Sequence, residues 1–550
     1  MSDPTAEHFD FIVVGGGSAG AVVAARLSEQ SRVRVLLLEA GVWENGLKFR
    51  LPVLTPFALA QKRAVWNFAT EPEAGLNGRT LAWPRGKGMG GSSLVNGMLW
   101  VRGDPREYDR WAAMGCEGWS YADLLDHFRR SETYTHGNPG QRGRKGNVSV
   151  VRHRPADDLS GAFLAACRNL QIPLPDDYNA GVSEGAAYLQ FNLRGGLRHG
   201  TDRAYLDSAR KRGNLVIREN ALATRIIFDG AKAVGVEYRT RSGLNTAYCG
   251  REVVISCGAI HSPKLLELSG IGNHDILQRA GVATFLHRPG VGENLRDHLN
   301  SRIGYHTHFR GTLNDVQHSL FWKLNAGWQW LRQRGGPLSI IGATAHAWAK
   351  TRPDLDRADV KIQLLQYSAG HSTGNISTRL DSMPGFSLSN FVLRPESAGS
   401  CHIRINDADA PPEISANYLR HEDDIRSTIG ALRLIGKIVA DNAFRDFVRS
   451  VDPAFEPLGR DDELLDWARS TGLSSYHPIG TCKMGVDTLS VVDSKLRVIG
   501  IAGLRVADAA IMPTMPSSNT HAPAVMIGEK AAAIIKSDHS LGAVSEHVPS

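Results

Sequence analysis

The sequence lacks the signals that would place the chain across a membrane or send it out of the cell. Its first ten residues, MSDPTAEHFD, are acidic and lead directly into an apolar run that we assign to a strand, so we expect no signal peptide. No apolar stretch reaches the length of a membrane-spanning helix. We therefore expect a cytoplasmic protein with no transmembrane segment.

Cysteine is scarce, and its spacing excludes the common structural uses of thiols. None of the six cysteines belongs to a C-x-x-C pair, so we predict neither a metal site nor a disulfide framework. Reduced thiols are the rule in a cytoplasm. Cys482 lies in a motif described below, but no base partner is evident, and we expect a buried structural thiol. The other five are Cys116, Cys167, Cys249, Cys257 and Cys401.

Basic residues are in excess but are not gathered into a binding surface. The net charge is +7 and the pI about 9.1, with Lys and Arg interspersed among Asp and Glu. The densest basic group, Arg142, Arg144 and Lys145, lies in a glycine-rich stretch that we expect to be a solvated loop. We expect no nucleic-acid partner, because no motif supports one. A weak attraction to anionic membrane surfaces stays open.

The length and composition are those of a soluble multi-part enzyme. At 550 residues the chain is long enough for a large buried core, and hydrophobic residues make up 42% and charged residues 22%. We find no repeat, low-complexity tract or long linker. We therefore expect a single compact multi-part enzyme and not a string of domains joined by linkers.

A glycine turn near the N-terminus is the strongest local signal. The apolar run 11–14 predicts a buried strand, Gly15, Gly17 and Gly20 form G-x-G-x-x-G, and residues 21–29 have a helical composition. A second predicted strand, 34–38, ends in Glu39, where a carboxylate can accept hydrogen bonds from ribose hydroxyls. This arrangement predicts a dinucleotide whose pyrophosphate meets the helix N-terminus, and it does not distinguish NAD from FAD.

Further motifs follow this turn along the chain. Residues 84–103, PRGKGMGGSSLVNGMLWVRG, form a Gly/Ser segment whose backbone can lie flat against a planar or phosphorylated ligand. An apolar strand at 252–257 runs into GAIHSPKLLELSGIG, a turn and helix that indicate a return to the nucleotide sheet. The C-terminal part holds YHPIGTCKMG, LRVADAAIMP and SSNTHAPAVMIGEKAAAII, the last ending in a helix.

Together these motifs resemble the glucose-methanol-choline (GMC) family of FAD-dependent alcohol oxidoreductases. The resemblance covers nearly the whole chain. Within the family, the motifs are most similar to those of the bacterial choline-dehydrogenase-like branch. It implies an α/β fold with an α+β part: a Rossmann-like FAD-binding domain built from discontinuous segments, and a mixed-sheet substrate-binding domain. We expect the first at residues 1–155, 196–306 and 471–550, and the second at 156–195 and 307–470.

The resemblance also implies which residues hold the cofactor. Some relatives carry a histidine, covalently linked to FAD, where this chain has Val95, so we expect FAD to be bound non-covalently. The expected contacts are Gly15, Gly17, Ser18, Ala19, Gly20, Glu39 and Ala40 at the ADP half; Trp66, Arg85, Gly90, Gly91, Ser92, Asn96, Gly97, Met98 and Leu99 toward the flavin; Ala223 at the adenine; Asp508 and Ala509 at the ribityl chain; and Pro523 near the ring. For Trp66 alone, packing within an aromatic cluster is the other interpretation.

Two histidines match the family's catalytic pair. Oxidising an alcohol requires removal of the hydroxyl proton, which suits a histidine near its working pKa, and a fixed polar group at the alkoxide oxygen. We expect His477 to act as general base and His521 to bond the substrate oxygen. Some choline-active relatives have asparagine at the second position, and Asn519 lies two residues earlier. Alignment on the following MIGE favours His521.

The substrate is less constrained than the cofactor. Choline would need aromatic rings and usually a carboxylate around its ammonium group. Acidic residues are few between 330 and 400, and Asp354, Asp356 and Asp359 cluster in an expected surface turn. We therefore predict a neutral primary alcohol. The tryptophans able to supply rings, whose other interpretation is core packing, are Trp322, Trp328, Trp330 and Trp348.

Several alternatives remain open at this point. The electron acceptor is O2 in an oxidase, or a quinone or carrier in a dehydrogenase, and we favour a dehydrogenase from the branch resemblance alone. Other interpretations are a hydroxynitrile-lyase-like enzyme with a structural flavin, a flavin-binding protein without turnover, and an NAD-dependent dehydrogenase.

Overall fold

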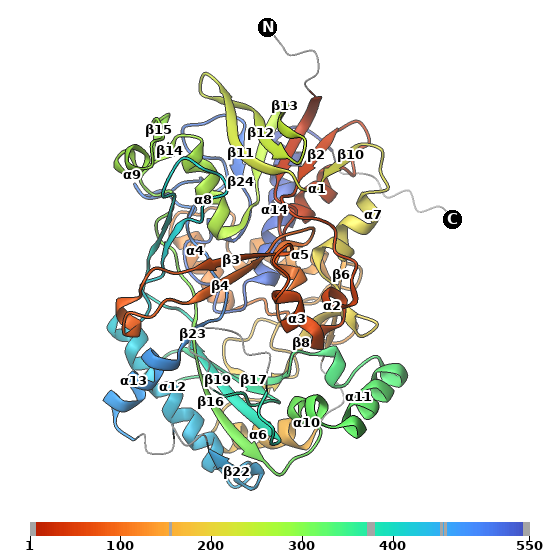
Figure 1. The fold of residues 1–550 in the computed structure, drawn as a ribbon, viewed down its shortest axis with the longest axis vertical. Helices are drawn as coiled ribbons and strands as arrows, with labels where there is room; N and C mark the ends of the chain where they lie inside the picture. Colours follow the sequence, from red (N-terminus) through yellow and green to blue (C-terminus); the bar gives the residue numbers. More distant parts are fainter. Residues whose placement is uncertain (1–6, 153–156, 371–379, 452–454, 456–458, 543–550) are drawn as a thin grey trace.

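The computed structural model describes residues 7–152, 157–370, 380–451, 455 and 459–542. Two large β-sheets lie one above the other along the long axis of the molecule (Figure 1), and they are built from interleaved segments of the chain. This is a mixed α/β architecture, as the sequence predicted.

The upper sheet is mostly parallel, as expected for the predicted dinucleotide-binding fold. Its strands run parallel in the order β10–β2–β1–β13–β24, and β12 and β11 extend it on the β13 side as an antiparallel hairpin. The strands are β1 (Glu7–Val14), β2 (Val35–Leu38), β10 (Leu215–Arg218), β11 (Leu222–Asp229), β12 (Lys232–Thr240), β13 (Gly243–Ile255) and β24 (Leu504–Val506). The predicted strands 11–14 and 34–38 are therefore neighbours, and the chain returns beside them through β13.

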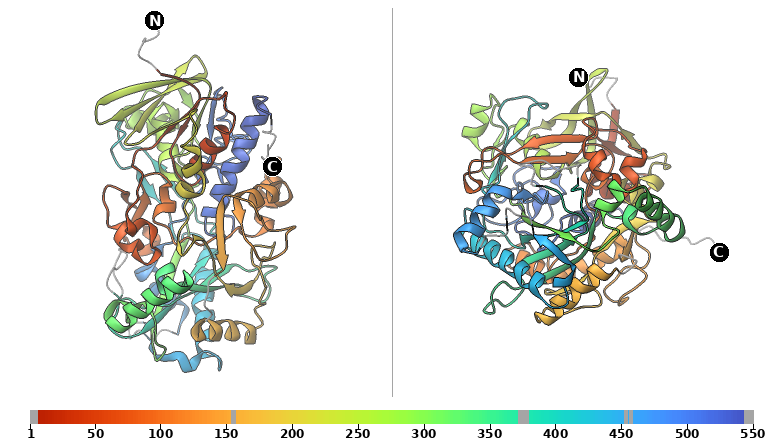
Figure 2. Two further views of the ribbon diagram at one scale, coloured as in Figure 1. Left: turned by 90° about the vertical axis from the view of Figure 1, so that its right-hand side faces the viewer. Right: turned by 60° about the horizontal axis from the view of Figure 1, so that its bottom comes forward.

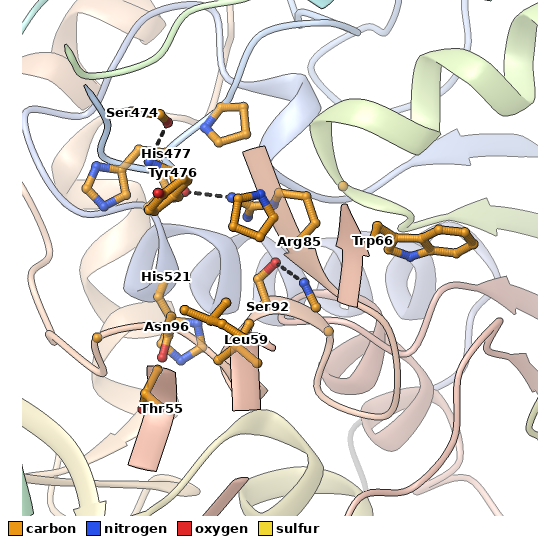
Figure 3. Close-up of a pocket in the computed structure, with 18 of the residues that line it drawn as sticks. Thr55, Leu59, Trp66, Arg85, Ser92, Asn96, Ser474, Tyr476, His477 and His521 are labelled. Carbon is orange, nitrogen blue, oxygen red and sulfur yellow. Dashed lines mark hydrogen bonds between the residues drawn. The ribbon is translucent and has the colours of Figure 1, made fainter. Parts of the chain in front are cut away.

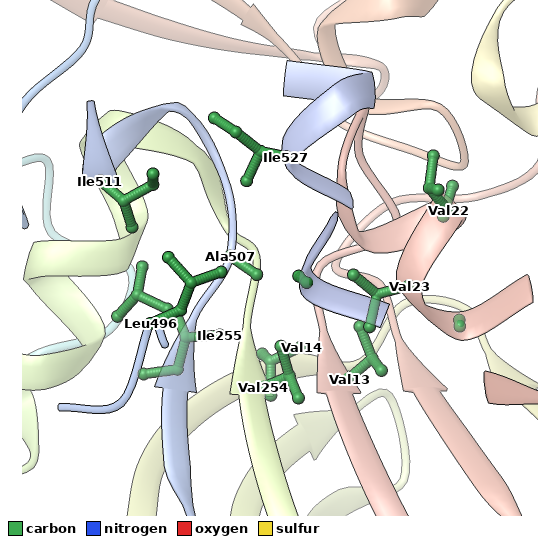
Figure 4. Close-up of a cluster of buried hydrophobic side chains, with 14 of the residues drawn as sticks. Val13, Val14, Val22, Val23, Val254, Ile255, Leu496, Ala507, Ile511 and Ile527 are labelled. Carbon is green, nitrogen blue, oxygen red and sulfur yellow. The ribbon is translucent and has the colours of Figure 1, made fainter. Parts of the chain in front are cut away.

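Two helices pack on this sheet because their apolar side chains meet a fully buried strand surface. Figure 4 shows Val13 of β1 beside Val23 of helix α1 (Gly20–Leu27), in a buried cluster that also contains Ile255 of β13 and Ile527 of helix α14 (His521–Asp538). Burial of such side chains contributes roughly 1.5–3 kcal/mol each. The turn between β1 and α1 needs glycine, since a Cβ on Gly20 would meet the Gly15 carbonyl oxygen at 1.9 Å.

The lower sheet is antiparallel in the order β22–β16–β19–β18–β17–β7, with β23 on the free part of β16. Helices α6 (Asp158–Asn169) and α12 (Glu422–Ala440) pack on this sheet. Figure 2 shows both of them at the lower end of the molecule. The strands are β7 (Gly185–Tyr188), β16 (Leu299–Thr307), β17 (Ala343–Ala349), β18 (Val360–Leu365), β19 (Gly385–Val392), β22 (Val448–Val451) and β23 (Leu473–Ser474).

Shorter elements join the two sheets. A hairpin of β3 (Val65–Ala69) and β4 (Ala82–Gly86) lies between them (Figure 1). The remaining helices are α2 (Leu47–Arg50), α3 (Thr55–Leu59), α4 (Pro105–Ala113), α5 (Tyr121–Ser131), α7 (Asp207–Ala209), α8 (Gly258–Leu268), α9 (His274–Arg279), α10 (Leu313–His318), α11 (Leu320–Gln333) and α13 (Asp461–Thr471). The remaining strands are β5 (Glu132–Thr133), β6 (Val148–Arg152), β8 (Gln190–Arg194), β9 (Leu197–Arg198), β14 (Ile271–Gly272), β15 (Leu286–His287), β20 (Ser400–His402) and β21 (Glu413–Ser415).

The division into two domains stays a prediction, and two strands lie on its borders. β16 and β23 fall within the ranges expected for the FAD-binding domain, yet both pair in the lower sheet. The expected boundary at 155/156 lies outside the described residues.

Within the described ranges, no helix combines the length and apolarity needed to cross a bilayer. The same residues contain no group of three or more His, Cys, Asp or Glu side chains arranged to hold a metal ion. The six cysteines are free thiols, and burial raises the pKa of Cys482 well above its ordinary value. Cys482 is thus a buried, inert thiol.

Candidate active site

A cavity of about 800 Å³ runs between the two sheets and receives most of the predicted site residues. One end is lined by the glycine turn after β1, and the other by the segment 474–478 and the face of the lower sheet. Cavities of this size are typical of sites for cofactors together with a small substrate. Figure 3 shows the middle of this cavity, with Arg85 reaching the carbonyl oxygen of Tyr476.

The glycine-turn end offers free backbone donors beside a buried carboxylate. Among the described residues, the N–H groups of Gly17, Ser18 and Ala19 have no intramolecular acceptor, which is expected at the start of a helix. The Glu39 carboxylate accepts from the N–H groups of Gly16 at 2.9 Å and Gly41 at 2.8 Å. Each of its oxygens keeps a second lone pair, so the carboxylate can also accept from a ribose hydroxyl.

The Gly/Ser segment packs directly on the glycine turn. Gly91 has φ +51°, and a Cβ there would meet the Cα of Gly17 at 2.7 Å, so only glycine permits this approach. The Gly90 N–H donates to the Gly16 carbonyl at 2.7 Å. The two turns therefore form one continuous wall of the cavity, and the Gly/Ser segment lies where a ligand bound at α1 would continue.

Most, but not all, of the predicted cofactor residues line this cavity. Those that do are Gly15, Gly17, Ser18, Ala19, Glu39, Ala40, Trp66, Arg85, Gly91, Ser92, Asn96, Gly97, Met98, Leu99, Ala223, Asp508 and Ala509. Gly20, Gly90 and Pro523 do not. Gly20 packs against the carbonyl oxygen of Gly15, and the Gly90 N–H donates to the carbonyl oxygen of Gly16. Both glycines therefore shape the cavity wall without lining the cavity. Pro523 is buried within α14.

A chain of hydrogen bonds fixes the proton positions on His477. Nε2 of His298 lies 3.1 Å from the carbonyl oxygen of Leu393, which can only accept, so this nitrogen carries the proton. Burial lowers the pKa of His298 to about 3, so its Nδ1 has a lone pair. That Nδ1 lies 3.0 Å from Nδ1 of His477, which must therefore be the donor. The lone pair of His477 is thus on Nε2.

The environment keeps His477 neutral. Burial, followed by the nearby His298, Lys361 and Arg85, lowers the pKa of His477 well below its ordinary value. Its backbone N–H donates to Oδ1 of Asp297 at 2.6 Å, and the Asp297 carboxylate also accepts from Ser474 and Tyr418. The imidazole is therefore held in one place and one tautomer, with its lone pair on Nε2.

Asn519, not His521, is the side chain on this lone pair. Its Nδ2 lies 2.9 Å from Nε2 of His477. The ammonium group of Lys361, on β18, donates to Oδ1 of Asn519 at 2.8 Å, and this fixes which end of the amide faces His477. Burial lowers the pKa of Lys361 to about 7. Sequence reasoning missed His298 and Lys361, and it weighed Asn519 but chose the neighbouring position.

His521 also lines the cavity, but it is the first residue of α14 and faces the glycine turn. Its Nδ1 lies 3.1 Å from the hydroxyl oxygen of Ser18, and its buried Nε2 has no protein partner. Burial lowers its pKa to about 4. His521 thus lies beside Ser18, while Asn519, two positions before the start of α14, contacts His477. The expected role of His521 at the substrate oxygen stays a prediction.

Comparisons with known proteins agree with this geometry. The family model described as "GMC oxidoreductase" matches residues 9–300 with its N-terminal part and 395–528 with its C-terminal part. The chain belongs to the GMC oxidoreductase family. It is 36% identical over 539 residues to the oxygen-dependent choline dehydrogenase of Brucella anthropi, covering 97% of this chain and 95% of that protein. It is 37% identical to the mitochondrial choline dehydrogenase of Homo sapiens over 548 residues, covering 97% and 91%.

Solved GMC structures have the same architecture. Pyridoxine 4-oxidase, titled as from Mesorbium loti, superposes with a TM-score of 0.85 at 28% identity, covering 96% of this chain and 98% of that one. A formate oxidase structure superposes with a TM-score of 0.89 at 25% identity, covering 98% and 100%. As a GMC oxidoreductase, the protein is an FAD-dependent enzyme that oxidises CH–OH donors and resembles choline dehydrogenases.

The cavity fits FAD on observations of its own. Free N–H groups at the start of α1 and the unpartnered Nε2 of His521 face the same region, where a pyrophosphate needs donors. Glu39 lies at the end of β2, where it can reach a ribose. The narrow approach of Gly17 and Gly91 leaves room for a flat, extended ligand. Val95, which stands in place of a histidine used for covalent attachment, is buried in the cavity wall.

Proposed function

We propose that this enzyme oxidises a primary alcohol to the aldehyde, with His477 as general base and Asn519 as the group that holds the substrate oxygen. The observation that carries the proposal is the pair of atoms 2.9 Å apart at the end of the cavity: a histidine lone pair and an amide N–H. A substrate hydroxyl group that displaces this direct bond, with the two side chains moving apart, can donate its proton to Nε2 of His477. It can at the same time accept a hydrogen bond from Nδ2 of Asn519.

The surrounding residues support this division of roles. Nδ1 of His298 accepts a hydrogen bond from the Nδ1–H group of His477. When His477 takes a proton on Nε2, the N–H group at Nδ1 of the resulting imidazolium therefore keeps its hydrogen bond. Lys361 holds Oδ1 of Asn519, so Nδ2 stays directed toward the substrate oxygen once the substrate has displaced its bond to His477. When bound, FAD supplies the hydride acceptor. The cofactor-facing wall is formed by the Gly/Ser segment and by Asp508 and Ala509.

The proposal includes non-covalent FAD and an electron acceptor outside the chain. The choice between O2 and a quinone or carrier stays open, because the relatives include an oxygen-dependent and a mitochondrial choline dehydrogenase. Choline itself is not favoured. None of the four tryptophans considered as its aromatic cage lines the cavity, and Trp348 is buried in the core while Trp328 is exposed.

The test of the proposed function is the visible spectrum of the purified protein, recorded anaerobically before and after addition of a series of alcohols. Bleaching of the flavin by one class of alcohol, with formation of the aldehyde, is expected. The rate of recolouring in air separates an oxidase from a dehydrogenase. A yellow protein that no alcohol bleaches would favour a lyase or a flavin-binding protein, and a colourless one would contradict the cofactor assignment.

Replacing Glu39 with alanine is expected to weaken FAD retention about 10- to 100-fold, because a hydrogen bond to a charged group contributes roughly 1.5–3 kcal/mol. The measurement is the dissociation constant for FAD of the deflavinated protein, and Glu117→Ala, at an exposed carboxylate, is the matched control. Unchanged affinity in the Glu39 variant would exclude its role at the ribose. Flavin that stays with acid-precipitated wild-type protein would contradict non-covalent binding.

A further inference from the structure

The face of the lower sheet that meets the cavity carries a row of polar side chains that the proposed mechanism does not use. Arg302 on β16 pairs with Ser389 on β19, which pairs in turn with Gln363 on β18, so the three lie side by side across the sheet. All three line the cavity. Directly opposite residues on neighbouring strands have Cβ atoms about 4.5–5.5 Å apart.

These side chains have unused hydrogen-bonding capacity. Among the described residues, Arg302, Ser389 and Gln363 make no side-chain hydrogen bond, and Arg302 has no ion pair. The guanidinium group lies over the ring of Tyr367, 5.7 Å from its centroid, which restricts its orientation. The Arg302 guanidinium group, which has no counterion among the described residues, together with the Ser389 hydroxyl and the Gln363 amide forms a site for an oxyanion.

The charge of the cavity points the same way. Its lining contains two carboxylates, Glu39 and Asp508, and both lie at the dinucleotide end, where backbone N–H groups already bind them. The cationic side chains Arg302 and Lys323 lie in the remaining part of the lining. This distribution repels a quaternary ammonium group and attracts an anion.

The row lies within the length of a small molecule from the base. Phe391 is two residues from Ser389 on the same strand, about 7 Å along it. The ring centroid of Phe391 is 5.8 Å from that of His477. By this path Ser389, beside Arg302, lies within roughly 13 Å of His477, a span that one small substrate with a hydroxyl group and an anionic group can bridge together with the long Arg302 side chain.

We infer that the natural substrate is a primary alcohol that carries a carboxylate, and that Arg302, with Ser389 and Gln363, binds this carboxylate. The inference rests on the proposed alcohol oxidation and replaces the neutral alcohol expected from sequence. Arg302 is a binding residue at the non-reacting end, so it sets which alcohol is oxidised and leaves the proton transfer at His477 unchanged.

The test compares hydroxymethylbenzoates and short ω-hydroxy acids with their methyl esters, using kcat/KM for flavin reduction. The wild-type enzyme should prefer at least one acid over its ester by 10-fold or more. In Arg302→Gln this preference should disappear through a higher KM for the acid, whereas Arg302→Lys should restore part of it. Arg241→Gln, at an exposed arginine on the β12–β13 turn, is the matched control.

The outcomes separate the inference from the proposed function. If neutral alcohols bleach the flavin but every ester is used as well as its acid, the carboxylate inference is wrong and the alcohol oxidation stands. The inference is also wrong if Arg302→Gln keeps the acid preference. If no alcohol of either kind reduces the flavin, the proposed function itself fails.

A second observation stands on a different surface, helix α11. Its exposed apolar residues follow one face at i, i+4, i+8 and i+11, and on the opposite face Ala326 is buried. They are Leu320 (72% exposed), Phe321 (68%), Leu324 (67%), Trp328 (61%) and Leu331 (63%). Figure 2 shows the helix projecting from one side of the molecule. A contiguous apolar face of this kind marks an interaction surface.

The charges around α11 favour a lipid surface as the occupant. From residue 319 to 336 the sequence contains Lys323, Arg332 and Arg334 and no acidic residue. Exposed Phe57, on α3, and Lys323 both line the cavity, so this face borders its mouth. Aromatic and leucine side chains on one face with flanking cations are typical of helices that lie in the interface of an anionic bilayer. We propose that α11 docks the enzyme on such a bilayer.

The test is sedimentation with vesicles of phosphatidylglycerol and phosphatidylcholine, compared with phosphatidylcholine alone. We expect binding to the anionic vesicles that weakens with salt and falls at least 10-fold in the double variant Leu324→Glu/Trp328→Glu. Leu244→Glu, at an exposed leucine of the upper sheet, should bind normally. Equal binding of the α11 variant would overturn the proposal, as would a wild-type protein that ignores the vesicles and instead dimerises through this face.

Discussion

Replacing His477 with alanine is expected to lower the rate constant for alcohol-dependent reduction of bound FAD by about two to four orders of magnitude, the usual contribution of a general base. The protein should stay yellow, because His477 lies at the substrate end of the cavity, away from the glycine turn. Stopped-flow absorbance under anaerobic conditions measures this constant directly, without the reaction with the electron acceptor.

Two other histidines of the chain provide the controls for this prediction. His306→Ala, on β16 near the edge of the lower sheet, should reduce normally. His298→Ala removes the acceptor for the His477 Nδ1 proton and should give an intermediate loss, since the base remains but its tautomer is no longer fixed. If reduction by alcohol were near normal in His477→Ala, another group would have to be the base.

Replacing Asn519 with alanine is expected to lower the same rate constant about 10²- to 10³-fold, the effect of removing one donor from a developing oxyanion. His521→Ala should change it less than 10-fold and should chiefly weaken FAD binding, because His521 contacts Ser18 at the glycine turn. This pair of variants decides between the partner placed by the structure and the one expected from sequence alignment.

Lys361→Met extends this comparison. The variant keeps Asn519 but removes the donor that orients its amide, so reduction should slow without reaching the Asn519→Ala level. Loss of a buried ammonium group that has no ion-pair partner among the described residues should not lower thermal stability. A larger defect in His521→Ala than in Asn519→Ala would reverse the assignment and restore the original expectation.

Local sequence was sufficient for the parts of this enzyme that depend on short-range geometry. The turn at Gly15 and Gly20 is dictated by a steric contact between neighbours in sequence, and Glu39 follows β2 directly. The order of motifs identified the family, and with it the α/β fold and FAD. Residues 423–439 carry a long, regular amphipathic pattern, and they lie within helix α12 (Glu422–Ala440).

The arrangement around the base depended on tertiary structure. His298, His477, Asn519 and Lys361 come from four separate segments, and their hydrogen bonds cross 42 to 179 positions of the chain. Only Thr520 separates Asn519 from His521 in the sequence, yet Asn519 contacts His477 and His521, at the start of α14, contacts the glycine turn. No periodicity fixes such a choice at a helix start, where the backbone is irregular.

The sequence by itself determined the cofactor turn and the fold class, because each is encoded by neighbouring residues or by the order of motifs. Only the tertiary structure decided which side chain faces that base and which charges surround the substrate. Arg302, Ser389 and Gln363 become neighbours solely through the register of three strands. Register is set by the packing of whole sheets, and therefore cannot be deduced from any one segment.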